Sequence, residues 1–364
     1  MRRTLHGALS AALFLAGCGE EEPDTGAAVH DEPVYTVSVE SDIVYAKALG
    51  FLPQAPESIT ELSPLLDVYY PSDRSEIRPV FLWIHGGGFT GGSKTRDEIE
   101  EMAAFFAARG WVFVSINYRT TEVLGDGFEL CAVENGPEYE AAVEVYRGIA
   151  PPEWTRMSCE GASDGTEFHQ SIAMYAAQRD AKAALRWIVA NSATYDMDVN
   201  AITVGGNSAG AITTAALGIT DEDDFRDEIP AADDPTLATT NLSQTYTVQS
   251  LVWFWGARTK LMLFEDVYEE DPYDASDPPI FLAHGTAEKQ GESLTPYTEA
   301  LELQATYDRL GIDTELVLLD CEVDPNCPSE EGWGHGAWEA TVDGVSLSQR
   351  VFDFIVETQG LPVD

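Results

Sequence analysis

The amino-acid sequence predicts an α/β fold in which helices cover both faces of a mostly parallel central sheet. Apolar runs rich in Val, Ile and Leu, typical of strands buried on both faces, occupy residues 79–84, 111–116, 201–204, 249–255, 280–283 and 314–319. Helical patterns occupy residues 96–109, 175–190 and 346–357. Strands that alternate with helices pair in parallel. Ligands of such sheets bind beyond the carboxyl ends of the strands.

Composition indicates a folded and strongly acidic protein. Of the 364 residues, 44% are hydrophobic and 10% are aromatic, a content that excludes a disordered or fibrous chain. There are 63 acidic residues against 20 basic ones, which gives a formal net charge of −43. This charge argues against nucleic acid as a partner, favours solubility in salty surroundings, and disfavours anionic substrates at low salt.

One pentapeptide has the pattern of a nucleophile elbow. Gly206-Asn207-Ser208-Ala209-Gly210 follows the strand-like run 201–204 and precedes residues 211–217, which can continue as a helix. In G-x-S-x-G the serine stands on a tight strand-to-helix turn, and the small neighbours allow strand and helix to approach closely. The alternative is a chance cluster of small residues at a turn. The sequence around it favours Ser208 as a nucleophile.

A glycine-rich loop upstream predicts the oxyanion hole. His85-Gly86-Gly87-Gly88 ends the strand-like run 79–84, and such glycines let backbone N–H groups point into a cavity. We assign the hole to the N–H groups of Gly87, Gly88 and Ala209, because acyl transfer places negative charge on the former carbonyl oxygen. A loop that merely turns is the alternative. His85 itself is expected to support the loop.

The base and the acid are expected in two later loops. Among six histidines, His335 lies between glycines ahead of the helical segment 346–357, whereas His284 ends a buried strand and is expected to anchor the loop after it. We therefore predict His335 as the base that takes the serine proton. Glu288 is the predicted acid that orients the imidazole, and Glu292 is its competitor. The chain order serine, acid, histidine fits the elbow motif.

These motifs resemble the α/β-hydrolases of the hormone-sensitive-lipase-like and carboxylesterase group, which have an HGGG oxyanion motif. The resemblance covers about residues 60–358. It is carried by Leu66-Asp67-Val68-Tyr69-Tyr70-Pro71, His85-Gly86-Gly87-Gly88-Phe89, Asn117-Tyr118-Arg119, residues 180–188, the elbow, residues 278–286 and Gly334-His335-Gly336. It implies a triad of Ser208, His335 and an acid. The chain departs from the family in having Glu288 where aspartate is usual, and in an insertion at about residues 120–170.

The expected function is a carboxylic-ester hydrolase that acts on a small neutral ester through an acyl-enzyme, with no metal or organic cofactor. Two alternatives stay open: a serine peptidase on the same fold, and a catalytically inactive binding lipoprotein.

The insertion and residues 257–277 could roof the site. The aromatic residues of the insertion could line a pocket or form a small core of its own, and they are Phe128, Tyr139, Tyr146, Trp154 and Phe168.

The N-terminus predicts export and lipid attachment. Arg2 and Arg3 precede an apolar stretch at residues 8–16, which is typical of a signal peptide over residues 1–17. The sequence Leu15-Ala16-Gly17-Cys18 resembles a bacterial lipobox, so we expect cleavage before Cys18 and a lipid on it; an ordinary signal peptide is the alternative. Loss of the two arginines would change the charge from −43 to −45.

Export would place the mature chain in the bacterial cell envelope, in the periplasm or at the outer membrane. Residues 18–33 would then be an acidic tether and residues 34–364 the hydrolase domain. The four other cysteines allow three pairings in an oxidising compartment. Proximity favours Cys131 with Cys159 and Cys321 with Cys327. A metal site is disfavoured, because there is no Cys-x-x-Cys and no histidine at ligand spacing.

Overall fold

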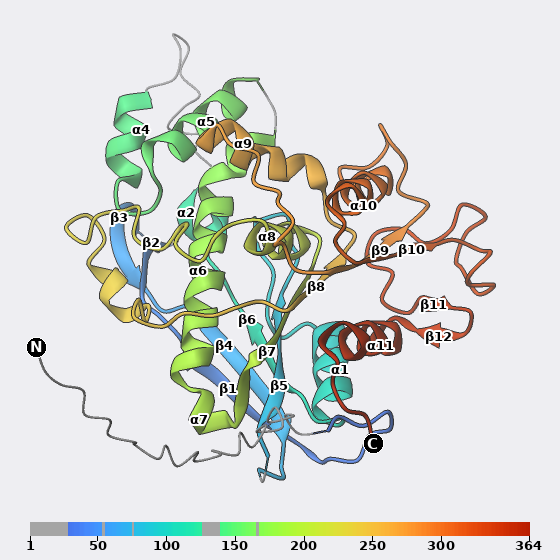
Figure 1. Ribbon diagram of the computed structural model, residues 1–364. Coiled ribbons are helices and arrows are strands. Elements are labelled where there is room, and N and C mark those ends of the chain that lie inside the picture. Colours follow the sequence, from blue (N-terminus) through green and yellow to red (C-terminus); the bar gives the residue numbers. More distant parts are fainter. Residues whose placement is uncertain (1–27, 53–54, 75, 126–138, 165–166) are drawn as a thin grey trace, which may run out of the picture.

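An eight-stranded sheet forms the centre of the structure, a computed structural model that describes residues 28–52, 55–74, 76–125, 139–164 and 167–364 (Figure 1). In spatial order its strands are β1 (Val37–Val44), β4 (Leu65–Pro71), β6 (Val112–Ile116), β5 (Arg78–Ile84), β7 (Met197–Asn207), β8 (Ser250–Phe254), β9 (Ile280–Gly285) and β10 (Thr314–Leu319). All strands from β6 to β10 pair in parallel, and β4 runs antiparallel to both of its neighbours. The six predicted strands and their mostly parallel arrangement are confirmed.

Successive side chains of one strand enter two different cores, which explains why the predicted runs are continuously apolar. Val80, Leu82 and Ile84 of β5 belong to one buried cluster, whereas Phe81 and Trp83 belong to the other. Helices α6 (Ser171–Ala190) and α8 (Ala209–Gly218) cover the first face, and α1 (Asp97–Ala107) and α11 (Leu347–Gln359) cover the second. Fully burying one such side chain contributes about 1.5–3 kcal/mol.

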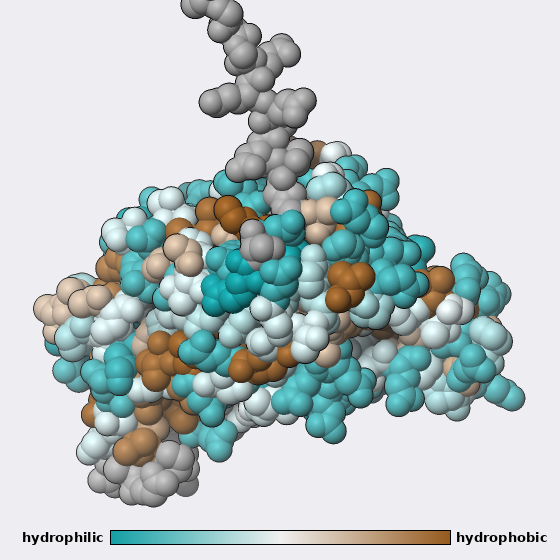
Figure 2. Space-filling view, turned by 90° about the horizontal axis from the view of Figure 1, so that it is seen from below, coloured by the Kyte–Doolittle hydropathy of each residue, from teal (hydrophilic) through white to brown (hydrophobic). Residues whose placement is uncertain are grey.

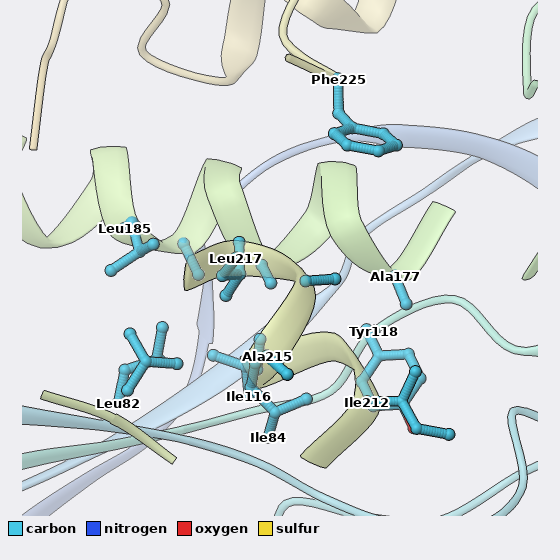
Figure 3. Packing of buried hydrophobic residues seen from close by; sticks show 14 of the residues in the cluster. Leu82, Ile84, Ile116, Tyr118, Ala177, Leu185, Ile212, Ala215, Leu217 and Phe225 are labelled. Atoms are coloured by element: carbon cyan, nitrogen blue, oxygen red, sulfur yellow. The ribbon is translucent and has the colours of Figure 1, made fainter. Parts of the chain in front are cut away.

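In the first core, helix α8 lies between the sheet and helix α6. Figure 3 shows Leu217 and Ala215 of α8 between helix α6 and the sheet residue Ile84. Helix α6 begins at Ser171, about one turn before the predicted start at residue 175. Nearly all of its residues are buried, charged ones included.

The insertion folds as short helices that join the main body. It contains α2 (Thr121–Leu124), α4 (Tyr139–Tyr146), α5 (Pro152–Asp164) and η1 (Glu167–Gln170). The expectation of a separate small core is wrong for Tyr146 and Trp154, which belong to the main cluster. Tyr139 packs against a small separate cluster of Ala142 and Cys159. Phe128 and the side chain of Phe168 lie outside the described part.

The two segments expected to roof the site pack against each other. Trp154 of α5 lies 5.4 Å, centroid to centroid, from Phe264 of α9 (Met262–Tyr268), and its Nε1 donates to the Tyr268 hydroxyl at 3.1 Å. The remaining elements are β2 (Ala48–Leu52), β3 (Ala55–Leu62), α7 (Ser192–Tyr195), η2 (Pro235–Thr239), η3 (Arg258–Leu261), α10 (Thr298–Leu310), β11 (Thr341–Val342) and β12 (Val345–Ser346).

The predicted disulfide between Cys321 and Cys327 is present. Cys159 is also disulfide-bonded; its predicted partner, Cys131, lies outside the described residues, as do Cys18 and the signal segment. Among the described helices, none is long and apolar enough to cross a membrane. The face shown in Figure 2 is mostly hydrophilic with separate small apolar patches, as the acidic composition leads one to expect.

Candidate active site

Ser208 stands on a strained turn between β7 and α8. Its backbone has φ 55° and ψ −120°, a conformation that costs a non-glycine residue roughly 1–3 kcal/mol and that persists where function requires it. A Cβ on Gly206 would lie 2.4 Å from the Gly210 carbonyl oxygen, and one on Gly210 would lie 2.0 Å from the Ile84 carbonyl oxygen. Both glycines are therefore required by the close approach of strand and helix, as the sequence predicts.

The glycine loop after β5 lies against this turn. Gly87 and Gly88 have positive φ values of 133° and 60°, and a Cβ on Gly87 would lie 2.1 Å from the carbonyl oxygen of Gly91. Gly88 and Ala209 line one cavity with Ser208, whereas Gly87 is not among its lining residues. The Ala209 N–H is the first of α8, and such groups have no intrahelical acceptor. Two of the three residues predicted to supply donors thus line the cavity.

His85 supports the loop from behind, as expected. It is buried, its ring stacks on Tyr118 with centroids 4.5 Å apart, and its Nδ1 lies 2.7 Å from the Gly86 carbonyl oxygen. Burial lowers the pKa of His85 to about 4, so the ring is neutral at physiological pH. Asn207 has a role that the sequence pattern does not indicate: its Oδ1 accepts from the Gly86 N–H at 3.2 Å and thereby joins the elbow to the loop.

His335 and Glu288 meet across two loops. His335 follows β10 and Glu288 follows β9, and His335 Nδ1 lies 3.1 Å from Glu288 Oε2. The carboxylate is largely buried, whereas the imidazole is 43% exposed. A hydrogen bond at Nδ1 fixes the tautomer that leaves Nε2 able to accept a proton. Ser208, His335 and Glu288 all line the same cavity. Glu292 is exposed, and it is Glu288 that contacts the imidazole.

Two hydroxyl groups hold the Glu288 carboxylate in place. Oε1 accepts from Ser293 Oγ at 2.7 Å and from Thr295 Oγ1 at 3.1 Å, and Thr295 Oγ1 also lies 3.2 Å from His335 Nδ1. Burial raises the pKa of Glu288, but the hydrogen bonds from His335 and Ser293 outweigh burial, and the pKa is lowered overall. The residue is therefore an anion at neutral pH, able to stabilise a charged imidazole.

A second histidine lies behind the pair. His284 is fully buried, and its Nδ1 is 3.8 Å from Glu288 Oε2 and 3.2 Å from the Gly285 carbonyl oxygen. Burial lowers the pKa of His284, which keeps the ring neutral. These contacts lie at the start of the loop that carries Glu288. The sequence predicts that His284 anchors this loop.

The cavity has a volume of about 290 Å³. Its lining consists of Gly88, Phe89, Gln170, Ser208, Ala209, Ile212, Ala257, Lys260, Glu288, Ser293, Leu294, Thr295 and His335. Of the described residues of the insertion, Gln170 lines the cavity, whereas Tyr146 and Trp154 do not. Lys260 is a buried cation that sequence reasoning missed, because nothing in the local pattern marks it as part of a site. Among the described residues, no cluster suitable for a metal ion is found.

Replacing Ser293 with alanine tests the support of the acid. We expect kcat/KM to fall about 10-fold, because one hydrogen bond to a charged group is worth about 1.5 kcal/mol or more. The hydrogen bonds to the Glu288 anion stabilise the fold at pH values above the ordinary pKa of a glutamate. This stabilisation is lost as the pH falls through the lowered pKa of the folded state. Ser293→Ala raises that folded-state pKa. The acid limb of the pH–rate profile should therefore move to higher pH, whereas an unchanged limb would contradict this role.

The mostly parallel sheet covered by helices on both faces is an α/β-hydrolase fold, as the sequence predicts. The chain matches the family model BD-FAE over residues 66–125 and 167–271, on both sides of the insertion. It is 27% identical to Carboxylesterase 3B of Mus musculus and 26% identical to Carboxylesterase 3 of Homo sapiens, in each case over 162 residues. That stretch is 44% of this chain and 21% of each relative, so the chain matches only about a fifth of their length.

Solved structures of esterases share the fold. Butyrate-bound esterase 2 of the planctomycete Thermogutta terrifontis aligns with a TM-score of 0.51 at 18% identity, covering 83% of this chain and 91% of that one. The same enzyme phosphorylated by paraoxon gives a TM-score of 0.53 at 18% identity, covering 88% and 94%. A truncated carbohydrate esterase from gut microbiota gives a TM-score of 0.52 at 17% identity, covering 91% and 99%.

Proposed function

We propose that the protein hydrolyses small neutral carboxylic esters through an acyl-enzyme on Ser208. The observation that carries the proposal is the shared cavity of Ser208, His335 and Glu288, in which His335 Nδ1 lies 3.1 Å from the carboxylate. A serine hydroxyl is a weak nucleophile at neutral pH and needs a base whose ring is oriented by a third group. Similarity to carboxylesterases over part of the chain supports the same reaction class.

The proposed reaction has two halves. Ser208 Oγ bonds to the ester carbonyl carbon while its proton moves to His335 Nε2, and the carbonyl oxygen becomes an oxyanion facing the N–H groups of Gly88 and Ala209. The intermediate collapses, the C–O bond to the alcohol breaks, and the alcohol leaves with the proton from His335. Water then attacks the acyl-enzyme with the same proton movements, releasing the acid and restoring Ser208. Glu288 stabilises the imidazolium in both halves. Each oxyanion donor is worth about 10²–10³ in rate.

The lining favours short uncharged acyl groups. Phe89, Ile212 and Leu294 offer apolar surface in a cavity of about 290 Å³, and the net charge of −43 repels anionic esters at low salt. The test compares p-nitrophenyl acetate, butyrate and octanoate with the p-nitroanilide of butyrate at low and high salt. We expect turnover of the short esters to exceed that of octanoate and of the anilide. Preferred anilide cleavage would make the protein a peptidase, and a folded protein without turnover on any substrate would be a binding lipoprotein.

A lipid anchor on Cys18 is proposed from the lipobox alone. We expect the full chain, expressed in a Gram-negative host, to incorporate a clickable fatty acid and to fractionate with membranes. Cys18→Ala should abolish both, since the thiol is the attachment point. Labelling that persists in Cys18→Ala would contradict the anchor, and Ser243→Ala, at an exposed position, serves as the control.

A further inference from the structure

A second, much smaller cavity lies on the side of α6 that faces away from the sheet. It has a volume of about 10 Å³ and lies between α6, the start of β2 and the η2 segment, which Figure 1 shows beside one another. The two cavities share no lining residue in the described part of the chain. Its lining consists of Ala46, Lys47, Ala48, Arg119, Arg179, Asp180, Ala183, Arg186, Arg226, Asp234, Thr236, Leu237 and Thr240.

One positive charge at this cavity has no ion pair. Five of the lining side chains are basic and two are acidic. Two of the basic ones, Lys47 and Arg226, are partly exposed and form ion pairs with carboxylates outside the lining. Both acidic groups are already used in ion pairs: Asp180 binds the guanidinium of Arg119 at 2.7 Å, and Asp234 binds that of Arg179 at 3.0 Å. Arg186 is therefore the one lining cation that has no ion pair among the described residues, and its buried charge needs a physical explanation.

Arg186 is the residue whose charge lacks a direct partner. Its side chain is 1% exposed, its Nε donates to the Thr240 carbonyl oxygen at 2.8 Å, and among the described carboxylates none forms an ion pair with it. Its Nη1 and that of Arg179 are buried with no hydrogen-bond partner in the described part of the chain. An arginine remains protonated even when buried, so it cannot avoid the cost of an unpaired charge by losing a proton.

The electrostatic environment of Arg186 agrees with this geometry. Burial lowers the pKa of Arg186, and the charges of Arg179 and Arg226 lower it further. Glu222 and Tyr246 act in the opposite direction, but Glu222 forms no ion pair with the guanidinium in the described residues. A buried charge without its partner strongly destabilises a fold. An anion in the cavity would supply the missing partner.

We propose that this cavity binds a monatomic anion, chloride under ordinary conditions, through Nη1 of Arg179 and of Arg186. The volume corresponds to about one water-sized sphere, which excludes phosphate, sulfate and carboxylates. The ion accepts hydrogen bonds from both guanidinium groups. It joins α6 to the η2 segment, because Asp234, which directly precedes η2, already holds Arg179. Chloride thus stabilises the fold through a specific site, separate from general screening of the acidic surface.

Crystals of the mature domain grown in sodium bromide test the site directly. An anomalous difference peak within hydrogen-bond distance of Arg179 Nη1 and Arg186 Nη1 is the expected result, because bromide replaces chloride. An ordered water without anomalous signal at this position, or an empty cavity, overturns the proposal. This measurement uses the wild-type protein, so it does not depend on whether a variant folds.

Thermal unfolding gives the matched solution test. At equal sodium concentration, chloride should raise the unfolding temperature by roughly 2 °C or more relative to gluconate, since a ligand that binds only the folded state stabilises it. Arg186→Leu should lose this anion-specific difference, whereas Arg147→Leu, which alters an arginine that is 58% exposed, should keep it. Equal unfolding temperatures of the wild type in the two anions would overturn the proposal.

Discussion

Ser208→Ala is expected to lower kcat/KM for p-nitrophenyl butyrate by about 10⁵- to 10⁶-fold, the range seen when a serine hydrolase loses its nucleophile. Without Oγ no acyl-enzyme can form, and what remains is the effect of oxyanion donors on attack by water. Initial rates should be measured over a range of substrate concentrations. Burst kinetics with the wild type and their absence in the variant would locate the loss in the acylation step.

The strained turn makes a control necessary. Alanine at position 208 keeps the Cβ and therefore the positive-φ strain, so the variant should fold with an unchanged circular dichroism spectrum. Ser243→Ala, at an exposed position outside the cavity, should retain full activity. If Ser208→Ala keeps more than about one hundredth of the wild-type rate, acyl transfer on Ser208 is not the mechanism.

Glu288→Gln is expected to lower kcat by about 10³- to 10⁴-fold with little change in KM. The amide has nearly the shape of the carboxylate but cannot stabilise a charged imidazole, and its N–H₂ group can impose the wrong tautomer on His335. Losses of this size accompany the equivalent change in other triads. The buried position of Glu288 and its 3.1 Å contact with His335 Nδ1 carry the prediction.

Glu292→Gln is the matched control for the acid. It removes one carboxylate from the same loop, but at an exposed position. We expect its rates to stay within about 2-fold of wild type, because exposed charge interactions are weak and screened by salt. A large loss in Glu292→Gln together with a mild one in Glu288→Gln would transfer the acid role to Glu292, which requires a different loop conformation.

Much of the fold could be predicted from sequence because the central strands are buried on both faces. Strands such as β5 and β8 are continuous apolar runs, which few other structures produce. The edge strand β1 was missed because its pattern is broken by Glu40, Ser41 and Asp42 and it is largely exposed. The alternation of strands with helices does not predict β4, because this strand joins the sheet antiparallel to its neighbour β6.

The site could be predicted only in part, because sequence patterns reflect local backbone geometry and not the contacts that tertiary packing creates. Ser208 and the glycine loop are local motifs, since backbone geometry fixes their neighbours in sequence. Glu288 could be ranked above Glu292 by position alone, whereas its support by Ser293 and Thr295 depends on how a loop folds back. The burial of Lys260 beside the cavity depends on tertiary packing, which leaves no periodic signal.

Peptide mass spectrometry after reaction with paraoxon tests the central claim most directly. The reagent phosphorylates an activated serine hydroxyl, so a single diethylphosphoryl group should appear on the peptide that contains Ser208. Loss of esterase activity should be proportional to the fraction modified. Denatured protein, in which His335 and Glu288 no longer activate the hydroxyl, should remain unlabelled. An active enzyme that stays unmodified at Ser208, or that loses activity through a label at another residue, would contradict the account.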